Sequence, residues 1–187
     1  MRTMKELPAT MTRVATVVFA DLTGSTGVFE RLGNEEATHV ITGLTRWIGQ
    51  VCVRHGGRVV KTLGDGVMAV FGDVSQALDA VVHLQREHAQ RRGGAPGQPL
   101  QLQVGLDCGE LVEVAGDCFG DAVNVAARLS GSAGARGILA TDAVIDRLGQ
   151  PPPGARFQAL GVVPIRGKTQ ERELYRIEWQ QDQPAAA

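Results

Sequence analysis

Two aspartates stand where short apolar runs end. Asp21 follows the run VATVVFA, and Asp65 lies in a Gly-Asp-Gly turn between RVVKTL and VMAVF. If the two runs form adjacent central strands, the carboxylates meet, and they repel each other unless a cation separates them. Hard oxygen ligands of this kind suit Mg²⁺, which recruits substrate phosphates as further ligands. Either aspartate taken alone is better interpreted as a turn residue, so the pair carries the hypothesis.

The segment LTGST, residues 22–26, directly follows the first aspartate. Gly24 lets the backbone approach a ligand closely, and a helix is expected to begin beside it. Free N–H groups at a helix start bind phosphate well. Simple capping of that helix by Ser25 or Thr26 is an equally good interpretation of these residues alone. The position next to Asp21 favours triphosphate chemistry, which needs a metal ligand beside a phosphate site.

A third candidate is the pair Asn124 and Arg128. They lie four residues apart in VNVAAR, so a helix puts them on one face. Arginine offers a fixed charge and a fork of donors suited to phosphate, and asparagine can orient a sugar oxygen. Such a pair is more often part of a solvated face. Here the neighbouring residues are small and apolar, which favours a cleft or an interface.

Lys61 and Asp117 form the fourth candidate. Lys61 sits in the apolar strand VVKTL, where a lysine needs a partner, and Asp117 sits in the loop GDCFG. One side chain donates and the other accepts, so together they could read the N1 acceptor and the amino donor of an adenine edge. From spacing alone, a lysine that snorkels at a strand edge and a turn aspartate are the preferred interpretations.

These residues need a scaffold in which strands and helices interleave. Apolar, β-branched runs predict strands at 14–20, 100–106, 110–115, 137–141, 157–165 and 173–179, and a hairpin at 58–71. Helical spacing of apolar residues predicts helices at 34–55, 75–90 and 121–130. This order predicts an α+β fold with a mostly antiparallel sheet.

Composition limits the class of protein. The 187 residues suit one domain, expected at 14–179 between an N-terminal tail (1–13) and a flexible C-terminal tail (180–187). A net charge of −1 argues against a nucleic-acid binder, and no apolar run is long enough to span a membrane. Cys52, Cys108 and Cys118 lack CxxC spacing, which favours reduced thiols in the cytoplasm over disulfides or a zinc site.

Three long motifs occur in a fixed order and spacing: FADLTGST, KTLGDGVMAVF and GDCFGDAVNVAARL, followed by LGVVPIRGKTQERELYRI. Together they resemble the class III adenylyl/guanylyl cyclase catalytic domain, of the bacterial type with a short dimerisation arm. The resemblance covers residues 15–179. It implies a ferredoxin-like or palm-type antiparallel sheet with flanking helices.

The resemblance also implies roles for the candidate residues. Asp21 and Asp65 match two metal-binding aspartates, and Leu22 matches a position whose backbone carbonyl touches a metal. Two divalent ions, Mg²⁺ or Mn²⁺, are implied for each site. The phosphates of the substrate are expected at Thr23, Gly24, Ser25 and Thr26, with a further basic contact from Arg166.

For the nucleoside, the resemblance assigns Lys61 and Asp117 to the selection of adenine. Guanylyl cyclases carry Glu and Cys-type residues there, so this pair favours ATP. Asn124 matches a residue that orients the ribose, and Arg128 matches one that stabilises the transition state.

The implied activity is conversion of ATP to 3′,5′-cyclic AMP and pyrophosphate at the interface of a head-to-tail homodimer. A regulatory domain outside this chain is an expected partner, and neither nucleic acid nor a membrane is. Two alternatives remain open: a guanylyl cyclase, and a non-catalytic nucleotide-binding dimerisation module. A diguanylate-cyclase palm is disfavoured because its GG[DE]EF-type turn is absent.

Overall fold

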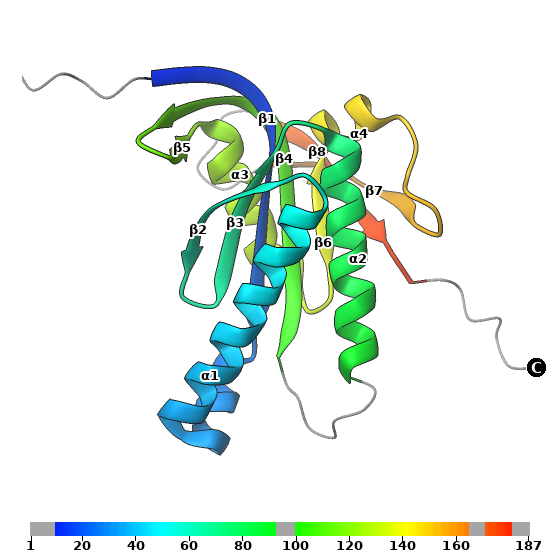
Figure 1. Cartoon of the computed structure of the whole chain (residues 1–187). Coiled ribbons are helices and arrows are strands. Elements are labelled where there is room, and N and C mark those ends of the chain that lie inside the picture. Colours follow the sequence, from blue (N-terminus) through cyan, green and yellow to red (C-terminus); the bar gives the residue numbers. More distant parts are fainter. Residues whose placement is uncertain (1–9, 93–99, 165–170, 181–187) are drawn as a thin grey trace, which may run out of the picture.

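The computed structural model describes residues 10–92, 100–164 and 171–180. One eight-stranded sheet has the order β2-β3-β1-β4-β6-β8-β7, with β5 paired to β4 (Figure 1). The strands are β1 (Thr10–Thr23), β2 (Arg58–Leu63), β3 (Gly66–Phe71), β4 (Gln101–Val114), β5 (Asp117–Phe119), β6 (Ile138–Thr141), β7 (Arg156–Pro164) and β8 (Glu171–Glu178). The helices are α1 (Ser25–Arg54), α2 (Val74–Arg92), α3 (Asp121–Ser132) and α4 (Asp142–Leu148). The predicted α+β class is confirmed, and among the described strand pairs only β4 and β6 run parallel.

The helices cover the two faces of the sheet unequally. In β1, alternate residues point to opposite faces, so Val18 and Ala20 join the core under α1 and α2, and Val17 and Phe19 join the core under α3. Figure 1 shows α1 and α2 side by side in front of the sheet. The second face is covered by α3, which contacts β1 and β4 most extensively. The candidate residues Asn124 and Arg128 lie on α3, and Asp21 contacts this helix through Ser130.

Helix α1 contains a break near its start. Gly33 has φ 76°, so α1 consists of two helical segments joined by a kink. A positive φ of this size favours glycine, which carries no Cβ to clash. The sequence predicted a helix start beside Gly24 and another at Asn34, and this arrangement agrees with both.

Strand β4 differs from its prediction. We expected two strands with a break at residues 107–109, whereas β4 is continuous from Gln101 to Val114. Asp107 falls in the expected break, but its carboxylate is buried and accepts hydrogen bonds from Thr141, from the amide of Cys108 and from Arg172. Because the charge is satisfied internally, the chain has no need to leave the sheet there.

Three other predictions of secondary structure were also wrong. β1 begins at Thr10 rather than at residue 14, so part of the expected N-terminal tail is strand. Helix α4 was not predicted, and β5 was expected to be loop. No helix among the described residues is long and apolar enough to cross a membrane.

Candidate active site

Asp21 and Asp65 lie together at one end of the β1–β3 pair. Asp21 is paired with Gly66, the first residue of β3, and the amide of Leu22 donates a hydrogen bond of 3.2 Å to the carbonyl of Asp65. The predicted adjacency of the two strand ends is therefore confirmed. A Cβ at Gly66 would overlap Oδ1 of Asp21, so a larger residue here would displace the Asp21 carboxylate. The carboxylate thus lies directly against the backbone of the turn that carries Asp65.

Ser130 also contacts the Asp21 carboxylate, a contact that the sequence analysis did not predict. Its hydroxyl donates a hydrogen bond of 2.9 Å to Oδ2 of Asp21 from the last turn of α3. The two residues are 109 positions apart, so only the packing of α3 on the sheet joins them. The one available signal was a polar residue among the apolar positions of this helix.

Burial of the half-buried Asp21 raises its pKa above the ordinary value. The hydrogen bond from Ser130 opposes this shift, and the neighbouring charge of Asp65 adds to it. Two carboxylates that are partly desolvated and repel each other are stabilised by a cation between them.

The donor set limits which metal fits. Among residues 10–92, 100–164 and 171–180, no group of three or more His, Cys, Asp and Glu side chains could hold a metal ion. An ion at Asp21 and Asp65 therefore needs further oxygen ligands, such as the Leu22 carbonyl, water and substrate phosphates. These all-oxygen donors fit Mg²⁺ or Mn²⁺.

The LTGST segment turns from β1 into α1. Thr23 ends β1, and Gly24 precedes the helix with φ 92°, in the left-handed region. No side chain caps this helix start, so the capping role considered for Ser25 and Thr26 is not found. The first turn also carries no acidic residue. Its N–H groups and positive dipole end are thus suited to an anion close to Asp21.

Lys61 and Asp117, which were considered separately as a strand-edge lysine and a turn aspartate, form an ion pair. Lys61 Nζ lies 2.8 Å from both carboxylate oxygens of Asp117, and each side chain is 37% exposed. The hydrogen bond from Lys61 lowers the pKa of Asp117, and the Cys118 amide contributes a second bond. A donor and an acceptor are therefore held side by side on an accessible surface.

A second set of contacts, also missed by the sequence reading, holds the β4–β5 hairpin against β2. Arg58 of β2 donates to the Gly116 carbonyl at 3.2 Å and to Glu113 Oε1 at 2.9 Å. Arg13 of β1 binds the same Glu113 oxygen at 2.6 Å. These hydrogen bonds lower the pKa of Glu113. They fix the hairpin that carries Asp117 beside the strand that carries Lys61.

Asn124 and Arg128 are both exposed on α3. Asn124 Nδ2 lies 3.4 Å from the carbonyl of Gly120, and within the described ranges no hydrogen bond or ion pair is formed by Arg128. Helix α3 is pressed onto β4 at Gly105, where a Cβ would overlap the backbone of Ala126 and Ser130. The helix therefore has one fixed orientation on the sheet.

The predicted site residues thus fall into three groups within one chain. Asp21, Leu22 and Asp65 meet; Lys61 and Asp117 meet; Asn124 and Arg128 share one helix. No hydrogen bond or ion pair in the described part of the chain joins one group to another. Arg166 lies outside the described residues.

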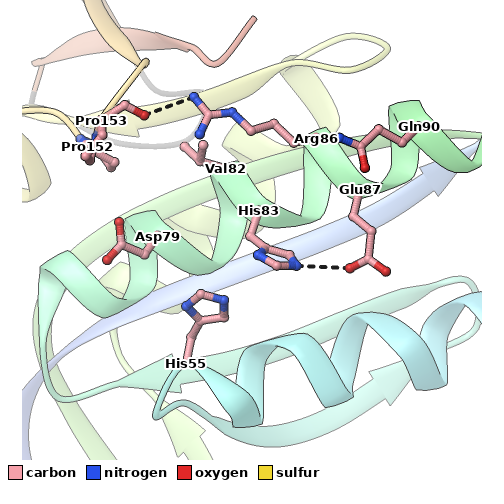
Figure 2. Close-up of a pocket in the computed structure, with 9 residues that line it drawn as sticks. All are labelled: His55, Asp79, Val82, His83, Arg86, Glu87, Gln90, Pro152 and Pro153. Carbon is pink, nitrogen blue, oxygen red and sulfur yellow. Dashed lines mark hydrogen bonds and ion pairs between the residues drawn. The ribbon is translucent and has the colours of Figure 1, made fainter.

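A pocket elsewhere on the molecule is lined by none of the predicted site residues. It has a volume of about 710 Å³ and lies between the end of α1 and one face of α2 (Figure 2). His83 Nε2 lies 3.0 Å from Glu87 there, and the side chain of Arg86 donates to the carbonyls of Pro153 and Gly154. The arginine is therefore occupied in holding the proline loop.

Known proteins match this chain over the region that contains these motifs. The family described as the adenylate and guanylate cyclase catalytic domain matches residues 7–178. A pH-sensitive adenylate cyclase of Mycobacterium tuberculosis is 35% identical over 92% of this chain and 42% of its own length. A putative adenylate cyclase of Rhizobium meliloti is 33% identical over 71% of this chain and 23% of its own length. The chain thus spans less than half of either relative.

Solved structures agree on the fold. An adenylate/guanylate cyclase/hydrolase from Silicibacter pomeroyi has a TM-score of 0.78 and 29% identity, covering 90% of this chain and 98% of that one. The adenylyl cyclase CyaB from P. aeruginosa, at 23% identity, has a TM-score of 0.75 over 90% of this chain and 95% of its own. The sheet order, the carboxylates at the β1–β3 end and the match over residues 7–178 give one conclusion: this chain belongs to the adenylate and guanylate cyclase catalytic domain family.

Proposed function

We propose that this chain is the catalytic domain of an adenylyl cyclase, which converts ATP to 3′,5′-cyclic AMP and pyrophosphate. The observation that carries the proposal is the meeting of Asp21 and Asp65 beside the uncapped N-terminus of α1. Two carboxylates that could hold metal ions lie there beside a helix start suited to an anion, and triphosphate chemistry needs both features. The named relatives, both adenylate cyclases, support the same activity.

The reaction is an intramolecular displacement. The 3′-hydroxyl of ATP gives up its proton to water and its oxygen attacks the α-phosphorus; the bond from that phosphorus to the bridging oxygen breaks, and pyrophosphate leaves. Asp21, Asp65 and the Leu22 carbonyl would hold two divalent ions, which when bound supply charge neutralisation and a lowered pKa of the attacking hydroxyl. The N–H groups at Ser25 and Thr26 bind phosphate oxygens.

The remaining groups orient the nucleoside and stabilise developing charge. Lys61 donates to N1 of adenine while Asp117 accepts from its amino group, and guanine offers the opposite pattern at these two positions. Asn124 orients the ribose so that its 3′-oxygen lines up with the α-phosphorus. Arg128 carries a permanent charge toward the α-phosphoryl oxygens in the transition state.

We further propose that each site is completed by a second copy of the chain. Ser130 points at Asp21, and Arg128 lies two residues earlier on the same helix. Two residues are just over half a helical turn, so Arg128 projects from the side of α3 opposite to Asp21. This geometry favours Asp21 and Asp65 from one chain acting with Asn124 and Arg128 from its partner in a head-to-tail dimer.

The test is product analysis with ATP and with GTP, each with Mg²⁺ and with Mn²⁺. Cyclic AMP formed from ATP, with much less cyclic GMP from GTP, supports the proposal. Preferred turnover of GTP would make the domain a guanylyl cyclase. A folded protein that binds nucleotide and forms neither product would make it a non-catalytic module.

A cytoplasmic location stays a prediction. The three cysteines, Cys52, Cys108 and Cys118, are all free and buried, in agreement with reduced thiols. A regulatory domain outside this chain is likewise a prediction, supported by the greater length of the two relatives.

A further inference from the structure

We propose that Ser130 is a positioning residue for the Asp21 carboxylate. In the proposed dimer it acts in one active site, while Arg128 of the same chain acts in the other. The inference rests on the proposed function. It concerns a residue that neither the motifs nor the predicted ligand set includes.

The contact is buried and specific. Ser130 is 0% exposed, and its hydroxyl has two acceptors within reach: Asp21 Oδ2 at 2.9 Å and the Gln103 carbonyl at 3.4 Å. A hydroxyl has one proton, so the shorter contact to the carboxylate is the preferred bond. Gly66 lies against the other oxygen, Oδ1. The carboxylate is therefore held between a hydrogen-bond donor on one side and a backbone surface on the other.

The donor itself cannot move independently of the sheet. Asp21 and Gln103 are paired residues of β1 and β4, and the backbone of Ser130 packs against Gly105 two residues further along β4. Strand pairing fixes Asp21 and Gln103 relative to each other, and the close packing of α3 on Gly105 fixes Ser130. A donor fixed in this way selects one orientation of the carboxylate, because a rotated carboxylate would lose the bond.

The same helix carries groups for two different sites. In the proposed dimer, Asp21 of one chain acts with Arg128 of the other. Ser130 therefore acts through Asp21 in one site, while Arg128 on the opposite side of α3 acts in the second. Loss of the Ser130 hydroxyl is expected to weaken metal binding by about 10-fold to 100-fold, the usual effect of removing a hydrogen-bond partner of a ligand.

The first experiment measures binding of Mn²⁺ by electron paramagnetic resonance, with an ATP analogue whose α–β bridge is a methylene. Ser130→Ala should weaken Mn²⁺ binding by about 10-fold or more, and Ser130→Thr, which keeps the hydroxyl, should bind better than Ser130→Ala. Ser132→Ala, an exposed position on the same helix, is the matched control and should bind as the parent does. If Ser130→Ala does not fold, Ser130→Cys replaces it, because its thiol is close in shape and a weak donor.

The second experiment separates positioning from general support of α3. Asp21→Ala and Arg128→Ala chains are mixed, so that one site of each hybrid dimer is intact. Ser130→Ala is then added to one chain or to the other. Product formation should fall further when it is added to the Arg128→Ala chain, because that chain supplies Asp21 to the intact site.

The outcomes are distinguishable from failure of the proposed function. If the parent protein forms cyclic AMP but Ser130→Ala binds Mn²⁺ as the parent does, the inference is overturned and the function stands. Equal losses from both placements would also overturn it, since Ser130 would then support α3 as a whole. A parent that forms no cyclic nucleotide contradicts the proposed function itself.

Discussion

Mixing two inactive variants of this chain tests the division of the site between two copies. In the proposed site, Asp21→Ala removes one metal ligand, and Arg128→Ala removes the charge that faces the α-phosphoryl group. Each homodimer loses both of its sites. In the proposed dimer, Asp21 and Arg128 of one chain serve different sites, so one site of a hybrid contains both lesions and the other contains neither.

The expected recovery of activity follows from the fraction of hybrid dimers and the number of intact sites in each. Equal amounts of the two chains that exchange freely give about half of all dimers as hybrids, and each hybrid has one intact site of two. The mixture should therefore reach about a quarter of the parent's specific activity. The recovered activity should peak at equal amounts of the two chains and fall toward zero at either extreme.

The assay is cyclic AMP formation after mixing and equilibration, with each variant measured alone at the same total concentration. The matched control mixes Asn124→Ala with Arg128→Ala, two lesions on the same face of α3. Each site of that hybrid lacks one of the two groups, so little activity should return. Well-folded Asp21→Ala and Arg128→Ala chains that exchange and still give no recovery would refute the divided site.

Three further predictions concern single residues. Arg128→Ala should lower kcat by about 10²–10³ with a smaller change in KM, measured by steady-state kinetics, because a preorganised charge acts mainly in the transition state; an unchanged kcat contradicts this role. Asp107→Ala should lower the free energy of unfolding by on the order of 3 kcal/mol in urea, since it leaves the buried Thr141 hydroxyl and Cys108 amide without their acceptor and removes one partner of Arg172; a loss near zero would mean that these bonds are not formed. The pKa of Asp117 is lowered by Lys61 from the ordinary value of 3.8, so the ion pair stabilises the fold above that pH and the contribution is lost as pH falls through the folded-state pKa. Lys61→Met should therefore be less stable than the parent at neutral pH, and the two unfolding curves should converge in acid; a constant difference across pH would contradict the assignment.

The sequence predicted those parts of the site that depend on local pattern. The apolar run before Asp21 and the turn around Asp65 each indicate the end of a strand. Antiparallel pairing of β1 with β3 then brings the two ends together. The helix face shared by Asn124 and Arg128 follows from helical spacing alone. Such features need only a few consecutive residues to be recognised.

The contacts that tie distant segments together could not be predicted in this way. Ser130 reaches Asp21 across 109 residues, and Arg58 reaches Glu113 across 55. Both depend on how a helix or hairpin packs on the sheet, for which single-sequence periodicity contains no information. Asp107 lies where the sequence analysis expected a break between two strands, whereas its buried contacts with Thr141 and Arg172 keep it within β4.

The two sides of α3 serve different sites of the proposed dimer, so moving one chain relative to the other can control its activity. Ser130 and the backbone at Gly105 lock α3 to its own sheet, so the distance from α3 to its own Asp21 is fixed within the chain. In the proposed dimer, the distance from Arg128 to the partner's Asp21 is set only by how the two chains are placed. A shift of one chain relative to the other therefore changes transition-state stabilisation and leaves the carboxylate geometry intact. Control through chain placement should then alter kcat while the dependence on metal concentration stays the same, a pattern that steady-state kinetics at several Mn²⁺ concentrations can separate from loss of the Ser130 bond.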